Sequence, residues 1–340
     1  MLVFIEAIVR VYNRYGRRDN MYKARIKILV KAEGQKFIDD VNEEFRNILE
    51  RDLDGSAHIV TQAEFDRVAS HFRLPAGVAP RASSGLHASA DAPLAFKRWL
   101  ERNVHAHQIA GYRAVTLSLK RTGQAPGDAT DVQMDLAAEL ADRYSAGELR
   151  VSHDQNLVLP WVREADLQAL YEAAKAASFA TPNIGFLTDM IACPGGDFCG
   201  LANARSIPVA AAITERFDDL DELYDIGDID LHISGCINSC GHHHSGHIGI
   251  LGVDKDGSEW YQVTLGGLDG SAISGGSAAG KVIGPSFAAD EVVDVVEAVI
   301  DTYRHQRAAN ERFIDTVKRV GLDPFKTAAN AQRRSTAHAA

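Results

Sequence analysis

The chain contains four cysteines, which fall into two close pairs. Cys193 and Cys199 lie in CPGGDFC with five residues between them, and Cys236 and Cys240 lie in SGCINSC with three residues between them. Four thiolates are the number that a tetrahedral zinc ion or a 4Fe-4S cluster requires. The sequence therefore predicts one metal site that uses all four cysteines.

The spacing and the neighbouring residues favour a cluster over zinc. Structural zinc sites usually place about two to four residues between paired cysteines, so the wider first pair weakens the zinc interpretation. Glycines also flank the cysteines, and they let backbone amides approach inorganic sulfides closely. These glycines are Gly195, Gly196, Gly200, Gly235 and Gly241. A four-cysteine zinc site stays open as the alternative.

The composition limits the partners that the chain can have. Its 340 residues are enough for two domains with a sizeable core. The chain is 46% hydrophobic and 24% charged, and its formal net charge is −10 at pH 7. Nucleic acids and anionic membranes favour basic surfaces, so this charge argues against both as partners.

The first residues do not resemble an export signal. The apolar run in MLVFIEAIVRVYNRYGRR is interrupted by Glu6 and Arg10, and no basic segment precedes it. We therefore expect a cytoplasmic protein. In that reducing compartment, paired cysteines serve as metal ligands or redox groups more often than as structural disulfides.

Hydrophobic patterns predict the elements that lie before the cysteines. Alternation over residues 112–120 and 148–162 predicts two strands, and helical spacing over 132–145 and 163–177 predicts two helices. This β-α-β-α order suggests a compact α+β unit that resembles half of a ferredoxin-like fold.

Further elements surround and follow the cysteines. We expect a helix over 210–217 and a strand over 231–240 that runs into a turn. Residues 247–253 and 260–267 have the pattern of a strand pair, and residues 290–321 that of one long helix or two.

Two stretches lack clear periodicity. Residues 51–92 include LPAGVAPRASSG and are typical of a linker between packed units. Residues 266–280, GGLDGSAISGGSAAG, are typical of a flexible surface loop.

The cysteine motifs resemble a known family. CPGGDFC followed by GCINSC, with HIGILG and YQVTLGG after them, is similar to the carboxy-terminal part of the sirohaem- and 4Fe-4S-dependent sulfite and nitrite reductases. The resemblance runs nearly from end to end. It implies that the four cysteines hold a 4Fe-4S cluster and that Cys240 also bridges this cluster to the sirohaem iron. A shared thiolate gives electrons a short covalent path between the cofactors.

Two other segments resemble parts of the family that lie near its cofactors. YGRRDNMYKARIKILV is similar to a segment that lines the sirohaem pocket, and sirohaem carries eight carboxylates. Arg18, Arg25 and Lys27 are therefore candidates to bind them, with a solvated basic strand as the alternative. QN in VSHDQNLVL makes Gln155 and Asn156 candidates for polar contacts to the cofactors.

Polar residues beside the second cysteine pair have simpler alternatives. Asn238 is a candidate donor to the surroundings of the cluster, and a plain turn role is the alternative. Since four thiolates already complete a cluster, we expect His242, His243 and His244 to be structural or exposed.

We therefore expect an α+β fold, in which a ferredoxin-like half-domain is followed by a mixed α/β domain for sirohaem and the 4Fe-4S cluster. The expected division is 1–50, the end of the first half of the sirohaem domain; 51–92, a linker; 93–163, the ferredoxin-like half-domain; 164–326, the 4Fe-4S/sirohaem-binding domain; and 327–340, a flexible tail.

The resemblance implies an oxidoreductase of sulfur assimilation. It would reduce sulfite to sulfide with six electrons at a sirohaem coupled to the cluster, and reduction of nitrite to ammonia is the alternative. A non-catalytic fragment that carries a cluster or a zinc ion bound by the four cysteines is the second alternative. The expected electron donor is ferredoxin or a flavoprotein reductase subunit.

The chain also departs from the family. Complete members carry a first half that supplies most of the cations around the substrate, and we expect the catalytic residues other than Cys240 to lie there. Since that half is missing, the resemblance implies a fragment, a mis-called start or one piece of a split enzyme. A first-half polypeptide is then a candidate partner, and the chain alone is expected to be a poor catalyst.

Overall fold

The computed structural model describes two compact units. The described residues are 1–20, 23–51, 59–83, 85, 89, 91–255, 257–271 and 274–334. The first unit is Met1–Pro75 and the second is Ala76–Ala340. One apolar core belongs to the first unit and two belong to the second.

The first unit is helical. Its helices are α1 Leu2–Tyr15, α2 Ile26–Glu33, α3 Gln35–Arg51 and α4 Gln62–Ala69. Val3, Ala7 and Val11 recur every four residues and so form one buried face of α1. Val41 and Ile48 on α3 belong to the same core. Helix α4 lies inside the segment that was expected to be a linker, of which residues 52–58, 84, 86–88 and 90 lie outside the described residues.

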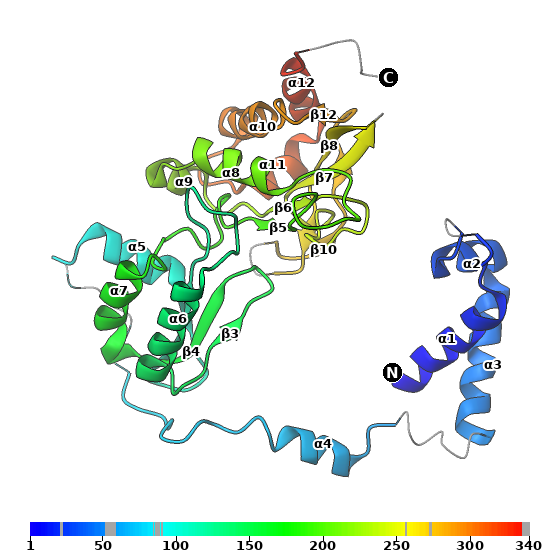
Figure 1. The fold of residues 1–340 in the computed structure, drawn as a ribbon, viewed down its shortest axis with the longest axis horizontal. Coiled ribbons are helices and arrows are strands. Elements are labelled where there is room, and N and C mark those ends of the chain that lie inside the picture. The colour runs from blue at the N-terminus through cyan, green and yellow to red at the C-terminus, as the bar shows by residue number, and fades with distance from the viewer. Residues whose placement is uncertain are drawn as a thin grey trace. The chain divides into compact units, whose positions relative to one another are not determined.

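The second unit begins with a four-stranded antiparallel sheet in the order β1-β2-β4-β3. Its strands are β1 Val104–Ala106, β2 Tyr112–Leu117, β3 Arg150–Val151 and β4 Leu157–Arg163. Its helices are α5 Leu94–Asn103, α6 Asp131–Tyr144 and α7 Leu167–Ala176, which lie beside this sheet in Figure 1. Thr130 and Gln133 form a capping box that fixes the start of α6.

The structure confirms most of the expected elements in this region and corrects one. The predicted strand over 112–120 and the predicted helices over 132–145 and 163–177 are present as β2, α6 and α7. The single strand predicted over 148–162 is wrong, because the chain turns back between β3 and β4. Gln155 in this turn has a φ of 57°, which a continuous strand does not allow.

A second sheet of the same unit carries the cysteine loops. Its order is β11-β8-β7-β6-β5, and β12 also pairs with β8. The strands are β5 Ile191–Ala192, β6 Leu231–Ser234, β7 Ile248–Lys255, β8 Ser258–Leu265, β11 Lys281–Val282 and β12 Phe287–Ala288. Strands β5, β6 and β7 run parallel, and β7 and β8 form the expected antiparallel pair.

Helices pack against this second sheet and complete the core (Figure 1). They are α8 Ile207–Arg216, α9 Leu220–Ile226, α10 Val292–Gln306, α11 Phe313–Val320 and α12 Asp323–Ala331. The tract 290–321 is thus two helices. Residues 327–331, which were expected in a flexible tail, continue α12, and residues 335–340 lie outside the described residues.

The glycine-rich stretch 266–280 contains a short pair of strands. Strands β9 Leu268–Asp269 and β10 Ser277–Ala278 pair within it. Ser274 is buried, and its hydroxyl lies 3.2 Å from Nε2 of the buried His247. Gly270, Gly275 and Ala279 are exposed, as expected of a surface loop, and its flexibility stays a prediction. Residues 272–273 lie outside the described part.

Over the described ranges, none of the helices combines the length and the apolar character needed to cross a bilayer.

Candidate functional site

Both cysteine pairs begin at the carboxyl ends of neighbouring parallel strands. Cys193 directly follows β5, and Cys236 comes two residues after the end of β6. The two strands pair in parallel, with Ala192 opposite Ile233, and the backbone N–H of Cys193 donates to the carbonyl of Ile233 at 3.1 Å. Since parallel strands end at the same edge of a sheet, the two loops start side by side.

Hydrogen bonds then join the two loops directly. The carbonyl of Gly235 accepts from the backbone N–H groups of Asn203 and Ala204 at 2.9 and 3.0 Å. The N–H of Gly196 donates to the carbonyl of Ala204 at 3.0 Å. The N–H of Gly235 donates to Sγ of Cys193 at 3.1 Å. The loop that carries Cys193 and Cys199 is therefore bonded to the chain immediately before Cys236.

Small residues allow this close approach. Gly195 has a φ of 60°, and a Cβ there would lie 2.4 Å from the backbone N of Ser206. A Cβ at Gly235 would lie 2.6 Å from the carbonyl oxygen of Ala204. Gly200 differs, because a Cβ there would have no neighbour within 4 Å. Several of the glycines beside the cysteines thus have a packing role in the protein itself.

All four cysteines are free thiols, and they differ in exposure. Cys236 is buried, Cys193 and Cys199 are half-buried, and Cys240 is exposed. In the part of the chain that the structure describes, no three His, Cys, Asp or Glu side chains are grouped as ligands of one ion. The four thiols are the number of ligands that a 4Fe-4S cluster requires, and a four-cysteine zinc site would use the same set.

The three consecutive histidines are structural or exposed, as predicted. His243 is buried, and Nδ1 of its ring lies 3.1 Å from the hydroxyl of Ser239. Burial lowers the pKa of His243 to about 4, so its ring is neutral at physiological pH. His242 and His244 are exposed.

Gln155 and Asn156 lie next to the first cysteine loop, and protein groups already satisfy their side chains. The amide of Gln155 donates to the carbonyl of Ala192 at 2.8 Å and accepts from its N–H at 2.9 Å. The buried amide of Asn156 accepts from the N–H of Leu119 at 3.0 Å and donates to Asp189 at 2.8 Å. Contacts from these two residues to a cofactor stay a prediction.

Asn238 is exposed in the turn between Cys236 and Cys240. The N–H of Ser239 donates to the carbonyl of Cys236 at 3.0 Å and closes this turn. The structure thus contains the turn that was the simpler interpretation of Asn238, and a contact to the cluster surroundings stays a prediction.

Arg18, Arg25 and Lys27 are exposed and belong to the first unit. Arg25 precedes α2 and Lys27 lies within it, so this part of the segment is a helix and not a strand, while the exposure of all three side chains agrees with the solvated alternative. Arg18 donates to the side chain of Asn13, and its guanidinium lies 5.6 Å from the ring centroid of Tyr12. Met21 and Tyr22, in the same segment, lie outside the described residues. Because the cysteines belong to the second unit, a role of these cations toward sirohaem stays a prediction.

The sequence analysis missed a polar cavity of about 350 Å³ at the start of β5 and β6. Asp189 lies two residues before β5, and Asp230 lies directly before β6. Burial, together with the neighbouring carboxylates of Asp269 and Asp154, raises the pKa of Asp230 to about 7. The acidic and histidine residues of the lining are Glu101, His105, His153, Asp154, Asp189, Asp228, Asp230 and Asp269.

A buried lysine next to this cavity was also missed. Nζ of Lys120 donates to the carbonyl of Asp154 at 2.6 Å and lies 3.3 Å from Oδ1 of Asp189. Lys120 follows the apolar pattern of β2, and its partners lie 34 and 69 residues further along the chain. A local pattern therefore carries no signal for this contact.

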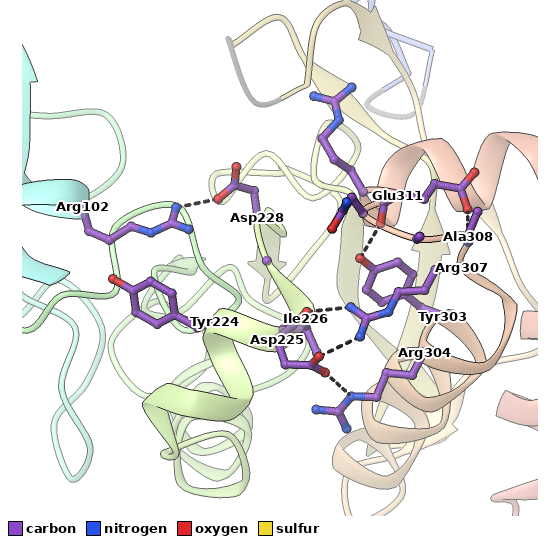
Figure 2. Close-up of a pocket in the computed structure, with 14 residues that line it drawn as sticks. Arg102, Tyr224, Asp225, Ile226, Asp228, Tyr303, Arg304, Arg307, Ala308 and Glu311 are labelled. Carbon is purple, nitrogen blue, oxygen red and sulfur yellow. Dashed lines mark hydrogen bonds and ion pairs between the residues drawn. The ribbon is translucent and has the colours of Figure 1, made fainter. Parts of the chain in front are cut away.

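A second cavity, of about 610 Å³, lies between α9 and the connection from α10 to α11. Figure 2 shows Arg304 and Arg307 directed at Asp225, and Arg102 directed at Asp228. The guanidinium of Arg307 donates to both the carbonyl and the carboxylate of Asp225, at 2.6 and 2.7 Å. Since each of these cations has a carboxylate partner, this cavity is bordered by a structural network of ion pairs.

Comparison with known proteins agrees with this arrangement. The family model described as the nitrite and sulphite reductase 4Fe-4S domain matches residues 186–336, and the model described as the nitrite/sulfite reductase ferredoxin-like half domain matches residues 107–177. The chain belongs to the nitrite and sulfite reductase family. The expected order of a ferredoxin-like half-domain followed by a 4Fe-4S domain is confirmed for this family member.

Proteins named as nitrite reductases and proteins named as sulfite reductases are both similar to this chain. The chloroplastic ferredoxin–nitrite reductase of Oryza sativa subsp. japonica is 27% identical over 314 residues, which cover 90% of this chain and 46% of that protein. The corresponding Zea mays enzyme is 30% identical, and the match covers 78% of this chain and 41% of that protein. A ferredoxin sulfite reductase of Mycobacterium tuberculosis is 26% identical, and the match covers 94% of this chain and 51% of that protein. The chain thus spans about half the length of these relatives.

Solved structures share the fold. The NirA protein of Mycobacterium tuberculosis matches with a TM-score of 0.59 at 24% identity, covering 95% of this chain and 52% of that chain. Dissimilatory sulfite reductase I matches with a TM-score of 0.55 at 13% identity, and the match covers 89% of this chain and 88% of that chain. At these identities the likeness concerns the α+β fold.

Proposed function

We propose that this chain is the cluster-carrying part of a sulfite or nitrite reductase. The thiolates of Cys193, Cys199, Cys236 and Cys240 would hold a 4Fe-4S cluster. The observation that carries this proposal is that the two loops that carry the free cysteines start at adjacent strand ends. Backbone hydrogen bonds join these loops to each other. Such a rigid edge holds thiolates from distant parts of the sequence in one place.

One hydrogen bond supports a metal-bound thiolate at Cys193. The N–H of Gly235 points at Sγ of Cys193 from 3.1 Å, so this sulfur accepts a bond from the backbone. Hydrogen bonds to ligand sulfurs stabilise their negative charge and tune the reduction potential of iron–sulfur clusters. The proposed electron donor is ferredoxin, which the names of the plant and mycobacterial relatives include.

Sirohaem is the proposed second cofactor, and it would supply the iron chemistry for six-electron reduction. Of the four thiols, that of Cys240 is exposed, which suits a ligand shared with a second metal centre. Arg18, Arg25 and Lys27 present exposed cations that can bind carboxylates. In this proposal, these side chains bind and orient the cofactor.

Sulfite is the proposed substrate, with sulfide as its product. The mycobacterial sulfite reductase that covers 94% of this chain supports it. Nitrite is the second candidate, because the plant nitrite reductases match with similar identity. Both substrates are oxyanions that need cations and proton donors while oxygen leaves as water. Steady-state reduction of each by reduced methyl viologen, at equal concentration, decides between them.

Absorption spectroscopy after anaerobic reconstitution tests the cofactors. Iron and sulfide alone should give the broad brown shoulder of a cluster, and added sirohaem should give Soret and Q bands. A protein that shows the shoulder without the bands would be a cluster-carrying subunit. Zinc binding without either signal would contradict the proposal and favour a four-cysteine zinc site.

Replacing Arg25 with alanine tests the basic segment. Loss of one charge-assisted hydrogen bond is worth about 1.5 kcal/mol, so sirohaem retention should fall about tenfold while cluster iron stays constant. Arg67→Ala, which changes another exposed arginine of the first unit, is the matched control. Equal loss of both cofactors in Arg25→Ala would indicate a folding role instead.

Turnover by the chain alone is proposed to be low. One lost cationic donor commonly costs about 10²- to 10³-fold in rate, and we propose that further donors come from a first-half polypeptide. Mixing the chain with such a polypeptide should raise methyl viologen-dependent turnover at least a hundredfold. Equal turnover without it would show that this chain completes its own substrate pocket.

A further inference from the structure

Gln155 belongs to the turn of the ferredoxin-like half-domain, but its side chain binds the strand that leads into Cys193. Its Nε2 donates to the carbonyl of Ala192 at 2.8 Å, and its Oε1 accepts from the N–H of the same residue at 2.9 Å. Ala192 is the last residue of β5 and directly precedes Cys193. A single amide thus binds both backbone polar groups next to a proposed cluster ligand.

These bonds lie on the open side of an edge strand. In the order β11-β8-β7-β6-β5, β5 is the last strand and has a neighbour only at β6. On the β6 side, the N–H of Cys193 donates to the carbonyl of Ile233. Edge strands leave every second N–H and C=O without a strand partner, and Gln155 pairs with the two that Ala192 presents. The start of the first cysteine loop is therefore held from both sides.

Gln155 is itself firmly fixed. Its φ of 57° is a left-handed conformation that costs conformational energy for a residue other than glycine. Its N–H donates to the carbonyl of Ser152 at 3.3 Å, and the neighbouring Asn156 is buried between Leu119 and Asp189. A strained conformation persists where the surroundings fix it from several directions, so the side chain of Gln155 is preorganised toward Ala192.

The position of Cys193 affects the electronic environment of its sulfur. Sγ of Cys193 accepts a hydrogen bond from the N–H of Gly235, which belongs to the other cysteine loop. A shift of Ala192 would move Cys193 relative to Gly235 and change this bond.

We infer that Gln155 is a positioning residue, through which the ferredoxin-like half-domain holds Cys193 in place and sets the environment of the cluster. This inference rests on the proposed role of Cys193 as a cluster ligand. It assigns to Gln155 a role through its two hydrogen bonds to the protein backbone, which is separate from the direct cofactor contact that the sequence predicts.

Gln155→Met removes both hydrogen bonds and keeps the length of the side chain. Outer-shell partners of metal ligands are commonly worth about 10- to 100-fold in affinity, so the variant should lose its cluster to a chelator about 10- to 100-fold faster than the wild type. Its reduced cluster should also differ from the wild type in EPR g values and midpoint potential. Gln168→Met, at an exposed glutamine on α7, should change none of these.

Gln155→Glu gives a signature that a merely structural role would not. A protonated carboxyl donates and accepts as the amide does, whereas a carboxylate accepts from the N–H of Ala192 and repels its carbonyl. The EPR spectrum should therefore resemble the wild type at the acid end of the pH range over which the wild type keeps its cluster. It should approach that of Gln155→Met as the pH rises. The wild type and Gln168→Glu should lack this pH dependence.

The outcomes separate the two proposals. A wild-type chain that takes up no 4Fe-4S cluster contradicts the proposed function and, with it, the positioning role. A wild-type chain with a cluster, and a Gln155→Met variant with unchanged chelator resistance, g values and potential, contradict the positioning role alone. If Gln155→Met does not fold by far-UV circular dichroism, Gln155→Glu decides, and a pH-independent, wild-type EPR spectrum contradicts the inference.

Discussion

The residue after Cys240 illustrates how closely the backbone packs at the cysteine loops. A Cβ at Gly241 would lie 2.0 Å from the carbonyl oxygen of Ile233, a residue of β6. That carbonyl accepts from the N–H of Cys193, so it cannot move without loosening the other loop. Gly200, which follows Cys199, has open space at the same point. The chain therefore offers a matched pair of glycines beside cysteines.

Gly241→Ala should destabilise the protein, because overpacking a rigid contact typically costs about 1 to 3 kcal/mol. Gly200→Ala should change stability by no more than about 0.5 kcal/mol. Urea unfolding of the cluster-free proteins measures both free energies of unfolding. Equal stability of the two variants would contradict the packing described at Cys240.

At the scale of elements, the sequence predicts best what depends on local periodicity. The strand pair over 247–253 and 260–267 is confirmed, because its alternation reflects burial along each strand. The turn at Gln155 was not predictable, because its left-handed backbone is supported by Ala192, 37 residues away. The contact between Ser274, within 266–280, and His247 likewise joins residues 27 positions apart, so local composition does not predict it.

The same distinction holds for the candidate site. Each cysteine pair is close in sequence, so its chemistry could be inferred from spacing. The cavity at the start of β5 and β6 could not, because its carboxylates come from five separate segments. Lys120 had no local signal either, since Asp189 is 69 residues away. Contacts between distant residues are set by tertiary packing, which periodicity does not encode.

Asp230, which directly precedes β6, should make the stability of the folded protein depend on pH. The pKa of Asp230 is raised to about 7, so the folded protein holds a proton there that the unfolded chain has released above about pH 4. Stability from this group therefore falls as the pH rises from about 4 to about 7, with a slope of at most about 1.4 kcal/mol per pH unit. Asp230→Asn should remove this loss, so its stability relative to the wild type should increase over that range.

Urea unfolding at several pH values measures this difference, with the exposed Asp135→Asn on α6 as the control. The comparison between variants is needed because the buried His247 acts in the opposite direction. Burial lowers its pKa to about 4, so its contribution to stability increases from about pH 4 to about pH 6.5. Parallel profiles for the wild type and Asp230→Asn would contradict the description of Asp230.

At the scale of the whole molecule, each apolar core contains buried residues of only one compact unit. The residues of the core built from α1, α2 and α3 belong to Met1–Pro75, and the two remaining cores belong to Ala76–Ala340. All four cysteines lie in the second unit, while the candidate cations for sirohaem lie in the first. The candidate cations for the sirohaem carboxylates and the proposed cluster ligands thus belong to different units.

A chain shortened to residues 76–340 should therefore fold and take up iron and sulfide as the full chain does, because it retains its own cores and all four thiols. Its sirohaem retention should be lower, because Arg18, Arg25 and Lys27 are removed. Iron, sulfide and haem analysis after reconstitution measures both. Loss of the cluster on removal of the first unit would mean that the cysteine loops need that unit, contrary to this account.

The central claim is that the four cysteines form one 4Fe-4S site. Its most direct measurement is iron and acid-labile sulfide per chain after anaerobic reconstitution, with Mössbauer spectroscopy, for the wild type and each Cys→Ser variant. The wild type should hold about four irons and four sulfides, and Cys193→Ser, Cys199→Ser, Cys236→Ser and Cys240→Ser should each lose most of both. A full 4Fe-4S complement in Cys193→Ser or Cys236→Ser would contradict the assignment.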